Sequence, residues 1–408
     1  MNPNIAANQQ RLFLEFLAEL RPHLRRDSAL PRRIKEIFGR NRSIGSRDRK
    51  LYRELVYTAL RFLPWIEPRL DDAPATAAKI TAWLAPELKP TTHYRTAHCG
   101  DWPAVPATLA EKASVLSTLL SSAPFDPQSL LPDWFREHCP AAFTSPHLDA
   151  INSRAGVWIR IQCLDRNLVL DEFRRQGWPF ELTEDFPDAI CLPPNADVAG
   201  TDAYRRGFIE IQDLGSQLVL GHVPVKSGEH WLDACAGAGG KTLQLARLLG
   251  DTGHVDATDI RVEILDELAD RAKRARLQNI TIVRTPAATY DGVLVDAPCS
   301  GSGTWRRQPH LKWCVKPETI AAFTATQLQI LNEHATRVRP GGLMVYATCS
   351  LSHHENRDVA AAFLAGQPQF IAEAPSRNFG TEFDGLGTVL LPGTRNTDGF
   401  YVALLRHT

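Results

Sequence analysis

Apolar residues recur at helical spacing through about the first 150 residues of the chain, with breaks at prolines. Near the amino end, the positions that carry this pattern are Leu12, Phe16, Leu20, Leu51, Leu55 and Leu60. Residues 43–46 interrupt it with the sequence Ser-Ile-Gly-Ser, which predicts a turn and a helix cap. This part of the chain is therefore predicted to be helical.

A different pattern begins near residue 154. Short apolar strands are predicted at residues 157–161, 189–192 and 208–212, with a helix at 167–175. We expect a small α+β unit here.

From about residue 226 onward, apolar strands alternate with helices. The predicted strands are 231–234, 255–258, 281–283, 293–295, 343–346 and 400–405, and the predicted helices are 242–249, 262–277, 317–338 and 354–364. Repeated βα units are typical of a doubly wound parallel sheet, which binds ligands at the carboxyl ends of its strands.

The composition fits a globular protein of several domains. The chain has 408 residues, of which 44% are hydrophobic, and disorder over most of its length is excluded. No run approaches about 18 apolar residues and the amino end has no leader pattern, so we expect a cytoplasmic protein that is neither secreted nor membrane-spanning. The eight cysteines are scattered without a C-x-x-C pair, which predicts free thiols rather than disulfides or a zinc ribbon.

The net charge of zero conceals a basic amino-terminal segment. Residues 1–70 contain 15 Lys and Arg against seven Asp and Glu, a charge of +8 that the remainder of the chain cancels. Arg47 and Arg49 follow the predicted turn in this segment. Composition alone favours a solvated helical face over a nucleic-acid surface.

A glycine-rich sequence, Asp-Ala-Cys-Ala-Gly-Ala-Gly-Gly-Lys-Thr, occupies residues 233–242 between a predicted strand and a predicted helix. Asp259 ends the next strand, 20 residues after Gly239. Glycines allow close backbone approach and an acid at this distance can bind ribose, so an adenosine-containing ligand is favoured over a purely structural turn. Cys235 replaces the first glycine of a phosphate-binding loop, and Thr242 replaces the third glycine of the dinucleotide fingerprint, which disfavours both.

Two cysteines follow predicted strands of the same sheet. Cys299 lies in Asp-Ala-Pro-Cys-Ser-Gly (296–301), and Cys349 lies in Thr-Cys-Ser (348–350). A single cysteine after a strand is more often a buried, inert residue. Two of them at the carboxyl edge of one sheet, beside Asp296, favour a chemical role.

Together these motifs resemble the RsmB/Sun family of RNA cytosine-5 methyltransferases. The resemblance also includes Arg306-Arg307-x-Pro-x-x-Lys312-Trp, then Arg-Pro-Gly-Gly (339–342) and Glu-Asn (355–356), and it spans about residues 205–408. Residues 46–61 resemble the NusB-like RNA-binding domain of the bacterial RsmB branch. The resemblance implies an α/β fold: a Rossmann-like class I methyltransferase domain at 221–408, preceded by a small α+β extension at 141–220 and an all-α NusB-like domain at 1–140.

The resemblance also implies roles for individual residues. Cys349 would be the nucleophile that adds to C6 of cytosine, Cys299 would assist product release, and Asp296 would bind the cytosine edge. S-adenosylmethionine would be held by Cys235, Ala236, Gly237, Ala238, Gly239, Gly240, Lys241, Asp259 and Asp296. Phosphate contacts are expected from Arg306, Arg307, Lys312, Arg47 and Arg49, with a solvated loop as the alternative for the first three. The adenine-contacting acid that the family usually has is absent near Ala287.

Small-subunit (16S) ribosomal RNA is the expected substrate, with transfer RNA the nearest competitor. A DNA methyltransferase, with Cys299 as nucleophile, and a non-catalytic RNA-binding assembly factor are the other hypotheses. Ser352 and Glu355 fit the pattern of a helix capping box, and we interpret them so. We expect no metal, because His353 and His354 have no further His or Cys at ligand spacing, and we expect a monomer.

Overall fold

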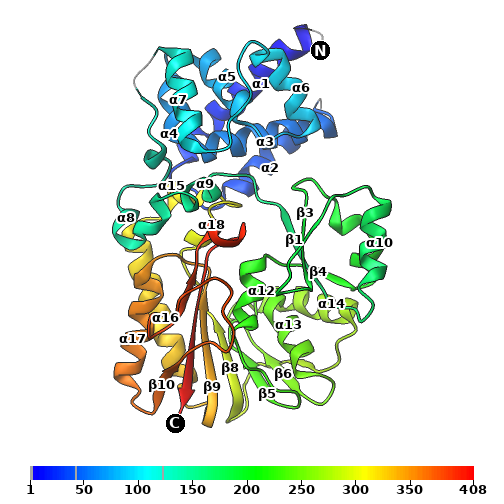
Figure 1. Ribbon diagram of the computed structural model, residues 1–408, viewed down its shortest axis with the longest axis vertical. Helices are drawn as coiled ribbons and strands as arrows, with labels where there is room; N and C mark the ends of the chain where they lie inside the picture. The colour runs from blue at the N-terminus through cyan, green and yellow to red at the C-terminus, as the bar shows by residue number, and fades with distance from the viewer. Residues whose placement is uncertain (1–2, 42–43, 122–123) are drawn as a thin grey trace. The chain divides into compact units, whose positions relative to one another are not determined.

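The structure, a computed structural model, describes residues 3–41, 44–121 and 124–408 and divides the chain into two compact units (Figure 1). The helical unit comprises Met1–Arg154 and Trp305–Lys316, and the sheet unit comprises Ala155–Thr304 and Pro317–Thr408. Ser43 of the predicted turn lies outside the described residues. Among the residues described, no helix is long and apolar enough to cross a membrane.

The helical unit confirms the helical spacing of its apolar residues. Phe13, Phe16 and Leu20 are buried along α1, and Leu51 and Leu55 are buried along α3. Helix α3 begins at Ser46, the last residue of the predicted turn, with Gly45 at its N-cap and no side-chain cap. The helices of the unit are α1 (Pro3–Leu20), α2 (Leu30–Arg40), α3 (Ser46–Arg61), α4 (Leu63–Ile66), α5 (Pro74–Leu84), α6 (Lys89–Cys99), α7 (Leu109–Leu120), α8 (Phe135–His138), α9 (His147–Ile151) and α15 (Leu311–Cys314).

The segment Trp305–Lys316 belongs to the helical unit, although 150 residues of sequence separate it from the rest of that unit. Lys312 is fully buried, and its Nζ donates hydrogen bonds to the carbonyl of Arg61 at 2.9 Å, the carbonyl of Leu130 at 3.0 Å and Oδ1 of Asn152 at 2.7 Å. Trp313 Nε1 donates to the carbonyl of Leu60 at 2.7 Å. The segment thus satisfies the last carbonyls of α3, and it places a cation at the negative end of that helix.

This packing overturns the expected phosphate contacts of two residues. Lys312 is 0% exposed and Arg306 is 4% exposed, so neither side chain presents its charge to a backbone phosphate. The Arg306 carbonyl accepts a hydrogen bond from Arg61 Nη2 at 3.1 Å. Arg307, between them, is exposed and stays a candidate for phosphate contact.

The expected domain boundaries at residues 140 and 220 also differ from the observed division. Helix α9 packs against the 3₁₀ turn Pro140–Phe143, which keeps residues 141–154 with the helices. The expected α+β extension shares a core with the large sheet, because Trp158, Leu214 and Phe379 are buried in one cluster. These residues form one compact unit rather than two domains.

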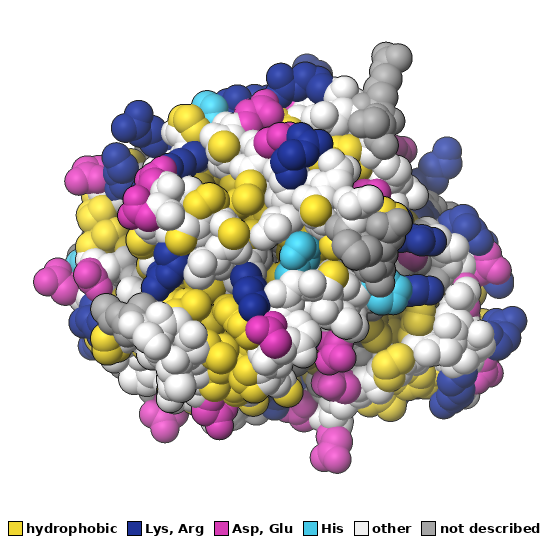
Figure 2. Space-filling model, turned by 90° about the horizontal axis from the view of Figure 1, so that it is seen from above, with side chains coloured by type: hydrophobic (Ala, Val, Ile, Leu, Met, Phe, Trp, Pro, Cys, Tyr) yellow, Lys and Arg dark blue, Asp and Glu magenta, His cyan; other side chains and the backbone are white. Residues whose placement is uncertain are grey.

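Basic side chains of the amino-terminal segment are paired with acidic ones. Arg40 lies 2.8 Å from Glu19, and Arg33 lies 2.9 Å from Asp27. Figure 2 shows Lys and Arg interspersed with Asp and Glu rather than gathered into one patch on the face drawn. Arg47 is exposed, whereas Arg49 is half-buried.

A small antiparallel sheet of order β2-β3-β1-β4 opens the sheet unit. Helix α10 packs on it through Val169, Leu170 and Phe173. The elements are β1 (Val157–Ile161), α10 (Asn167–Arg175), β2 (Glu181–Leu182), β3 (Ala189–Leu192), α11 (Asp202–Arg205) and β4 (Ile209–Ile211). This confirms the strands and the helix that the apolar pattern predicts.

The main sheet has eight strands in the order β10-β12-β9-β8-β5-β6-β7, with β11 beside β12. The strands are β5 (His230–Asp233), β6 (His254–Ala257), β7 (Ile280–Ile282), β8 (Tyr290–Asp296), β9 (Val338–Thr348), β10 (Phe370–Glu373), β11 (Thr388–Leu390) and β12 (Phe400–His407). Strands β5 to β9 pair in parallel, and β12 pairs antiparallel with β9, β10 and β11. The predicted Rossmann-like, mostly parallel sheet is confirmed.

Helices cover both faces of this sheet (Figure 1). Val293 and Val295 of β8 pack on the side of α16 and α17, whereas Leu294 packs on the side of α12 and α13. A strand that is buried on both sides has a continuous run of apolar residues, as β8 does. The helices of the unit from residue 214 onward are α12 (Leu214–Gly221), α13 (Gly240–Leu249), α14 (Leu265–Ala275), α16 (Pro317–Ala335), α17 (Arg357–Gly366) and α18 (Pro392–Arg395).

Candidate active site

The order of the strands reverses between β5 and β8, because β6 and β7 extend the sheet on one side of β5 and β8 and β9 extend it on the other. Such a switch point is where open α/β sheets bind ligands, outside the carboxyl ends of the strands. Strand β5 ends at Asp233, directly before the glycine-rich turn, and β8 ends at Asp296. The sequence-predicted motifs therefore meet at this edge of the sheet.

The glycine-rich turn depends on backbone conformations that favour glycine. Gly237 and Gly239 have φ of 51° and 86°, and a Cβ on Gly239 would lie 2.7 Å from Cγ of Leu268. Helix α13 begins at Gly240, directly after this turn. Glycine at position 239 thus lets the turn pack closely against Leu268 of α14 and Leu243 of α13.

Asp259, two residues after β6, is connected to the glycine-rich turn. Its carboxylate accepts a hydrogen bond from the Gly237 N–H at 2.8 Å and two from the Arg261 guanidinium at 3.0 Å. Burial alone would raise the pKa of Asp259, but the hydrogen bonds from Arg261 and Gly237 outweigh it and lower the pKa. Asp259 is therefore held as a carboxylate beside the turn.

Asp296 forms an ion pair with Lys241 of α13. The Lys241 Nζ lies 2.8 Å from Oδ2 of Asp296, and the Lys241 side chain is only 8% exposed. At the end of β5, burial raises the pKa of Asp233 to about 7, and the charge of Asp296 adds to this rise, which a hydrogen bond from Thr242 opposes. The ion pair links the glycine-rich turn to the motif that contains Cys299.

Cys299 and Cys349 lie side by side. Their sulfur atoms are 3.3 Å apart, although the residues are 50 positions apart in the chain. The hydrogen bond with Cys349 raises the pKa of the Cys299 thiol well above its usual range, and burial raises it further. Cys299 therefore holds its proton, which places a thiol directly beside the second sulfur. The prediction that parallel strands bring the two cysteines to one edge is confirmed.

Glu355 is not a helix cap, which corrects the capping-box interpretation. The Ser352 side chain makes no capping hydrogen bond. The Glu355 side chain is fully buried and accepts hydrogen bonds from the Ser300 N–H at 2.7 Å and from the hydroxyls of Ser300 at 2.5 Å and Ser350 at 2.6 Å. An S-x-x-E pattern satisfies the capping rule locally, and only the tertiary structure shows that the carboxylate points the other way.

The segment around Ala287 contains no acid, as the sequence shows. The Ala287 N–H donates to the Tyr290 hydroxyl at 2.7 Å, and this hydroxyl donates to Oδ2 of Asp256 at 2.8 Å. Sequence reasoning missed this network, because Asp256 lies within a strand in an otherwise apolar pattern. The segment is thus fixed to β6 through Tyr290.

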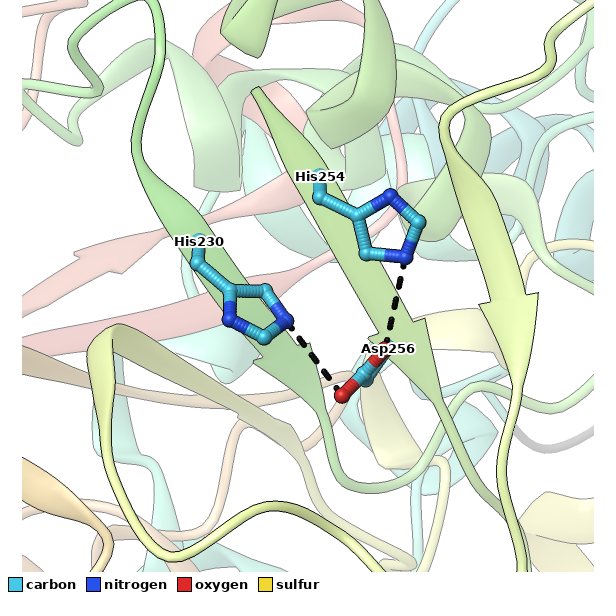
Figure 3. Close-up of side chains that lie close together, drawn as sticks. All are labelled: His230, His254 and Asp256. Carbon is cyan, nitrogen blue, oxygen red and sulfur yellow. Dashed lines mark ion pairs between the residues drawn. The ribbon is translucent and has the colours of Figure 1, made fainter. Parts of the chain in front are cut away.

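Asp256 also lies between two histidines from adjacent strands (Figure 3). Nε2 of His230 is 3.3 Å and Nε2 of His254 is 3.4 Å from its carboxylate. Sequence reasoning missed this group, whose donor atoms are of the types that bind metal ions. The carboxylate accepts from Tyr290, and His254 Nε2 lies 3.0 Å from the Thr281 hydroxyl, whereas Nε2 of His230 is buried and makes no hydrogen bond to another described residue.

A second group of this kind is exposed. Nδ1 of His353 lies 3.0 Å and Nδ1 of His354 lies 2.8 Å from Oδ2 of Asp358. Asp358 is the third donor that the sequence interpretation of the two histidines did not include. The expectation that the chain holds no metal stays a prediction.

Comparison with known proteins identifies the family. Residues 222–406 match the family described as 16S rRNA methyltransferase RsmB/F. The protein named ribosomal RNA small subunit methyltransferase B of Vibrio vulnificus is 30% identical over 399 residues, which cover 89% of this chain and 92% of that protein. This chain belongs to the RsmB/Sun family. It is therefore a methyltransferase, and its cofactor is S-adenosylmethionine.

Solved structures share the fold of this RsmB/Sun family member. The crystal structure of PH0851 superposes with a TM-score of 0.71 at 21% identity and covers 91% of this chain and 93% of that one. The structure of NSun6 from Pyrococcus horikoshii with SFG, an S-adenosylmethionine analogue, superposes with a TM-score of 0.61 at 17% identity, over 67% of this chain and 97% of that one. At these identities the likeness shows the fold.

The residues at the switch point fit the family's cofactor. Gly237 is half-buried and has a positive φ, and it lies directly beside Asp259 at the amino end of α13. The Asp259 carboxylate stands beside this turn with a lowered pKa, as a group that binds ribose hydroxyls requires. No cationic phosphate cradle is needed, because the cofactor has no phosphate. This agrees with the absence of a phosphate-loop pattern at Cys235.

Proposed function

We propose that this chain is an S-adenosylmethionine-dependent RNA cytosine-5 methyltransferase that modifies small-subunit (16S) ribosomal RNA. The observation that carries the proposal is the pair of sulfur atoms 3.3 Å apart at the carboxyl ends of β8 and β9. The names of relatives support ribosomal RNA, since the Vibrio vulnificus protein is named for the small subunit.

Methylation at C5 of cytosine needs a covalent nucleophile, because this carbon is a poor nucleophile until a group adds to C6. Cys349 is proposed to add its thiolate to C6, which turns C5 into an enamine carbon. The choice of Cys349 rather than Cys299 as the nucleophile rests on the family resemblance, and the 3.3 Å between the two sulfur atoms places either one beside the other.

The adduct must then be dismantled. After C5 has gained the methyl group, its proton leaves and the bond between C6 and the Cys349 sulfur breaks. Cys299 lies 3.3 Å from that sulfur, beside the bond that must break, which supports a role in product release. Asp296 is proposed to accept a hydrogen bond from the cytosine edge while Lys241 holds it at 2.8 Å.

S-adenosylmethionine, when bound, supplies the electrophilic methyl group. Asp259 is proposed to hold its ribose, and residues 235–241 are proposed to contact its methionine part. Asp296 lies at the boundary between this region and the cysteine pair, in keeping with a part in both sites. The turn and Asp259 keep their relative position through the Gly237 hydrogen bond of 2.8 Å.

The target cytosine must be unpaired or flipped out, because the sulfur approaches C6 from the face of the ring. Arg47, Arg49 and Arg307 are the remaining candidates for phosphate contact. Such an enzyme would act as a monomer in the cytoplasm, where ribosomal subunits assemble. Transfer RNA is the alternative substrate, because the catalytic residues do not distinguish between the two RNA classes.

The test is methyl transfer from labelled S-adenosylmethionine to four substrates: 16S ribosomal RNA, the assembled small subunit, transfer RNA and duplex DNA. We expect label in ribosomal RNA as 5-methylcytosine at one position, mapped by sequencing after bisulfite treatment. Label in transfer RNA or DNA alone would contradict the proposed substrate. Binding of ribosomal RNA without any transfer would favour a non-catalytic assembly factor.

A further inference from the structure

Glu355, at the end of the 3₁₀ turn His353–Glu355, is a fully buried carboxylate at the cysteine pair. Its Oε2 accepts hydrogen bonds from the hydroxyls of Ser300 at 2.5 Å and Ser350 at 2.6 Å. Its Oε1 accepts from the Ser300 N–H at 2.7 Å and from Gln327 Nε2 at 3.2 Å. All of these donors are neutral, and no cation is bonded to the carboxylate among the described residues.

The two serines are the chain neighbours of the two cysteines. Ser300 follows Cys299 in the turn after β8, and Ser350 follows Cys349 in the turn after β9. One oxygen of Glu355 therefore joins the two turns, in addition to the main-chain hydrogen bond from the Gly303 N–H to the Cys349 carbonyl at 2.9 Å. The Ser302 hydroxyl adds a further link, 3.0 Å from the Ser350 hydroxyl.

The negative charge of Glu355 also acts on the thiol. It is one of the groups that raise the pKa of Cys299, after the hydrogen bond with Cys349 and burial. A carboxylate near a thiol disfavours the thiolate, because like charges repel in a site of low dielectric. Glu355 thus bears on both the separation of the sulfur atoms and the position of the proton between them.

We propose that Glu355 is a positioning residue, which fixes the turns after β8 and β9 so that the two sulfur atoms stand together. It contacts neither sulfur directly and acts through Ser300 and Ser350. The inference rests on the proposed function, since it concerns the same reaction.

The test uses Glu355→Gln in the full-length protein, with Glu318→Gln as a matched control at an exposed position of α16. The first measurement is alkylation of each cysteine by iodoacetamide between pH 6 and pH 10, in the absence of RNA, followed by peptide mass spectrometry. We expect Cys299 in the Glu355→Gln protein to react faster than in the wild type at a given pH, since loss of the negative charge removes one of the causes that raise its pKa. Glu318→Gln should leave the profile unchanged.

The second measurement is methyl transfer under saturating S-adenosylmethionine. Misplacement of reacting groups by about 1 Å costs about 100-fold in rate, so we expect kcat to fall by about that factor in Glu355→Gln while KM for the cofactor stays within about twofold. Ser350→Ala, which removes one hydroxyl and leaves the carboxylate, should lower kcat by about tenfold and provides a milder variant should Glu355→Gln fold poorly.

An unchanged alkylation profile with unchanged kcat in Glu355→Gln would overturn the inference. Equal losses of cofactor binding, thermal stability and alkylation selectivity in Glu355→Gln and Ser350→Ala would also overturn the inference, because that pattern indicates a structural role only. A wild-type protein that transfers no methyl group to RNA would refute the proposed function, whereas the alkylation profile would still decide the role of Glu355.

Discussion

Lys312 and Arg307 lie five residues apart in one basic segment, yet the structure gives them opposite roles. The sequence favours phosphate contact for both. Lys312 is buried and donates to Arg61, Leu130 and Asn152, whereas Arg307 is exposed. Replacing each by methionine removes the charge and retains most of the side-chain volume. The pair of variants therefore separates a structural lysine from a surface arginine in the same segment.

The expected loss of stability in Lys312→Met follows from its three hydrogen bonds. Lys312→Met leaves three buried acceptors without a donor, each of which lowers the free energy of unfolding by about 1–3 kcal/mol. Removal of the buried ammonium raises the free energy of unfolding by several kcal/mol. We therefore expect the free energy of unfolding to fall by about 2–4 kcal/mol. Burial lowers the pKa of Lys312 well below its usual range, in agreement with a cost of burying the ammonium. Arg307→Met should change stability by less than about 0.5 kcal/mol, because its side chain is exposed.

The assay combines urea unfolding with the salt dependence of RNA binding. Lys312→Met should lower the unfolding midpoint and weaken amide protection in the last turn of α3, while the slope of log K against log salt stays unchanged. Arg307→Met should keep the midpoint and reduce that slope by about one. A reduced slope with full stability in Lys312→Met would refute the reasoning, because it would show a lysine that reaches phosphate.

Three further predictions concern the sheet unit. Asp233 has a pKa of about 7 when folded and about 4 when unfolded, so it lowers the stability of the protein as the pH rises from 4 to 7. In urea unfolding, Asp233→Asn should raise the free energy of unfolding above pH 7 by up to about 4 kcal/mol and flatten its dependence on pH. An unchanged pH profile would contradict the raised pKa. Asp259→Ala should weaken cofactor binding about 10- to 100-fold in calorimetry with thermal stability retained, and equal affinity would exclude the ribose role. Incubation with EDTA should leave methyl transfer unchanged, and loss of activity that zinc restores would show that the His230 or His353 group holds a functional metal.

The fold was predictable because its pattern is local and repeated. The apolar runs of β8 and β9 and the amphipathic spacing in α1 each depend on burial of one segment against its neighbours. The position of Trp305–Lys316 was not predictable, because its packing against α3 depends on contacts with residues about 250 positions away. From sequence alone, a basic residue in a loop is expected to be solvated, because the acceptors that could bind it inside the protein are not known.

The site was predictable to the extent that parallel strands end at one edge. That rule placed Cys299 beside Cys349, and Asp296 near the glycine-rich turn. It could not show the role of Glu355, because a short local pattern gave a sufficient explanation for this residue. It also missed Asp256, which lies within a strand and whose carboxylate accepts a hydrogen bond from the Tyr290 hydroxyl.

The central claim is that Cys349 makes the bond to cytosine and that Cys299, 3.3 Å away, helps to break it. The most direct measurement is denaturing electrophoresis of protein and labelled ribosomal RNA, with S-adenosylmethionine present, for Cys349→Ala and Cys299→Ala. We expect Cys299→Ala to accumulate a covalent complex of protein and RNA, and Cys349→Ala to form none. The reverse pattern, a complex with Cys349→Ala and none with Cys299→Ala, would contradict the account.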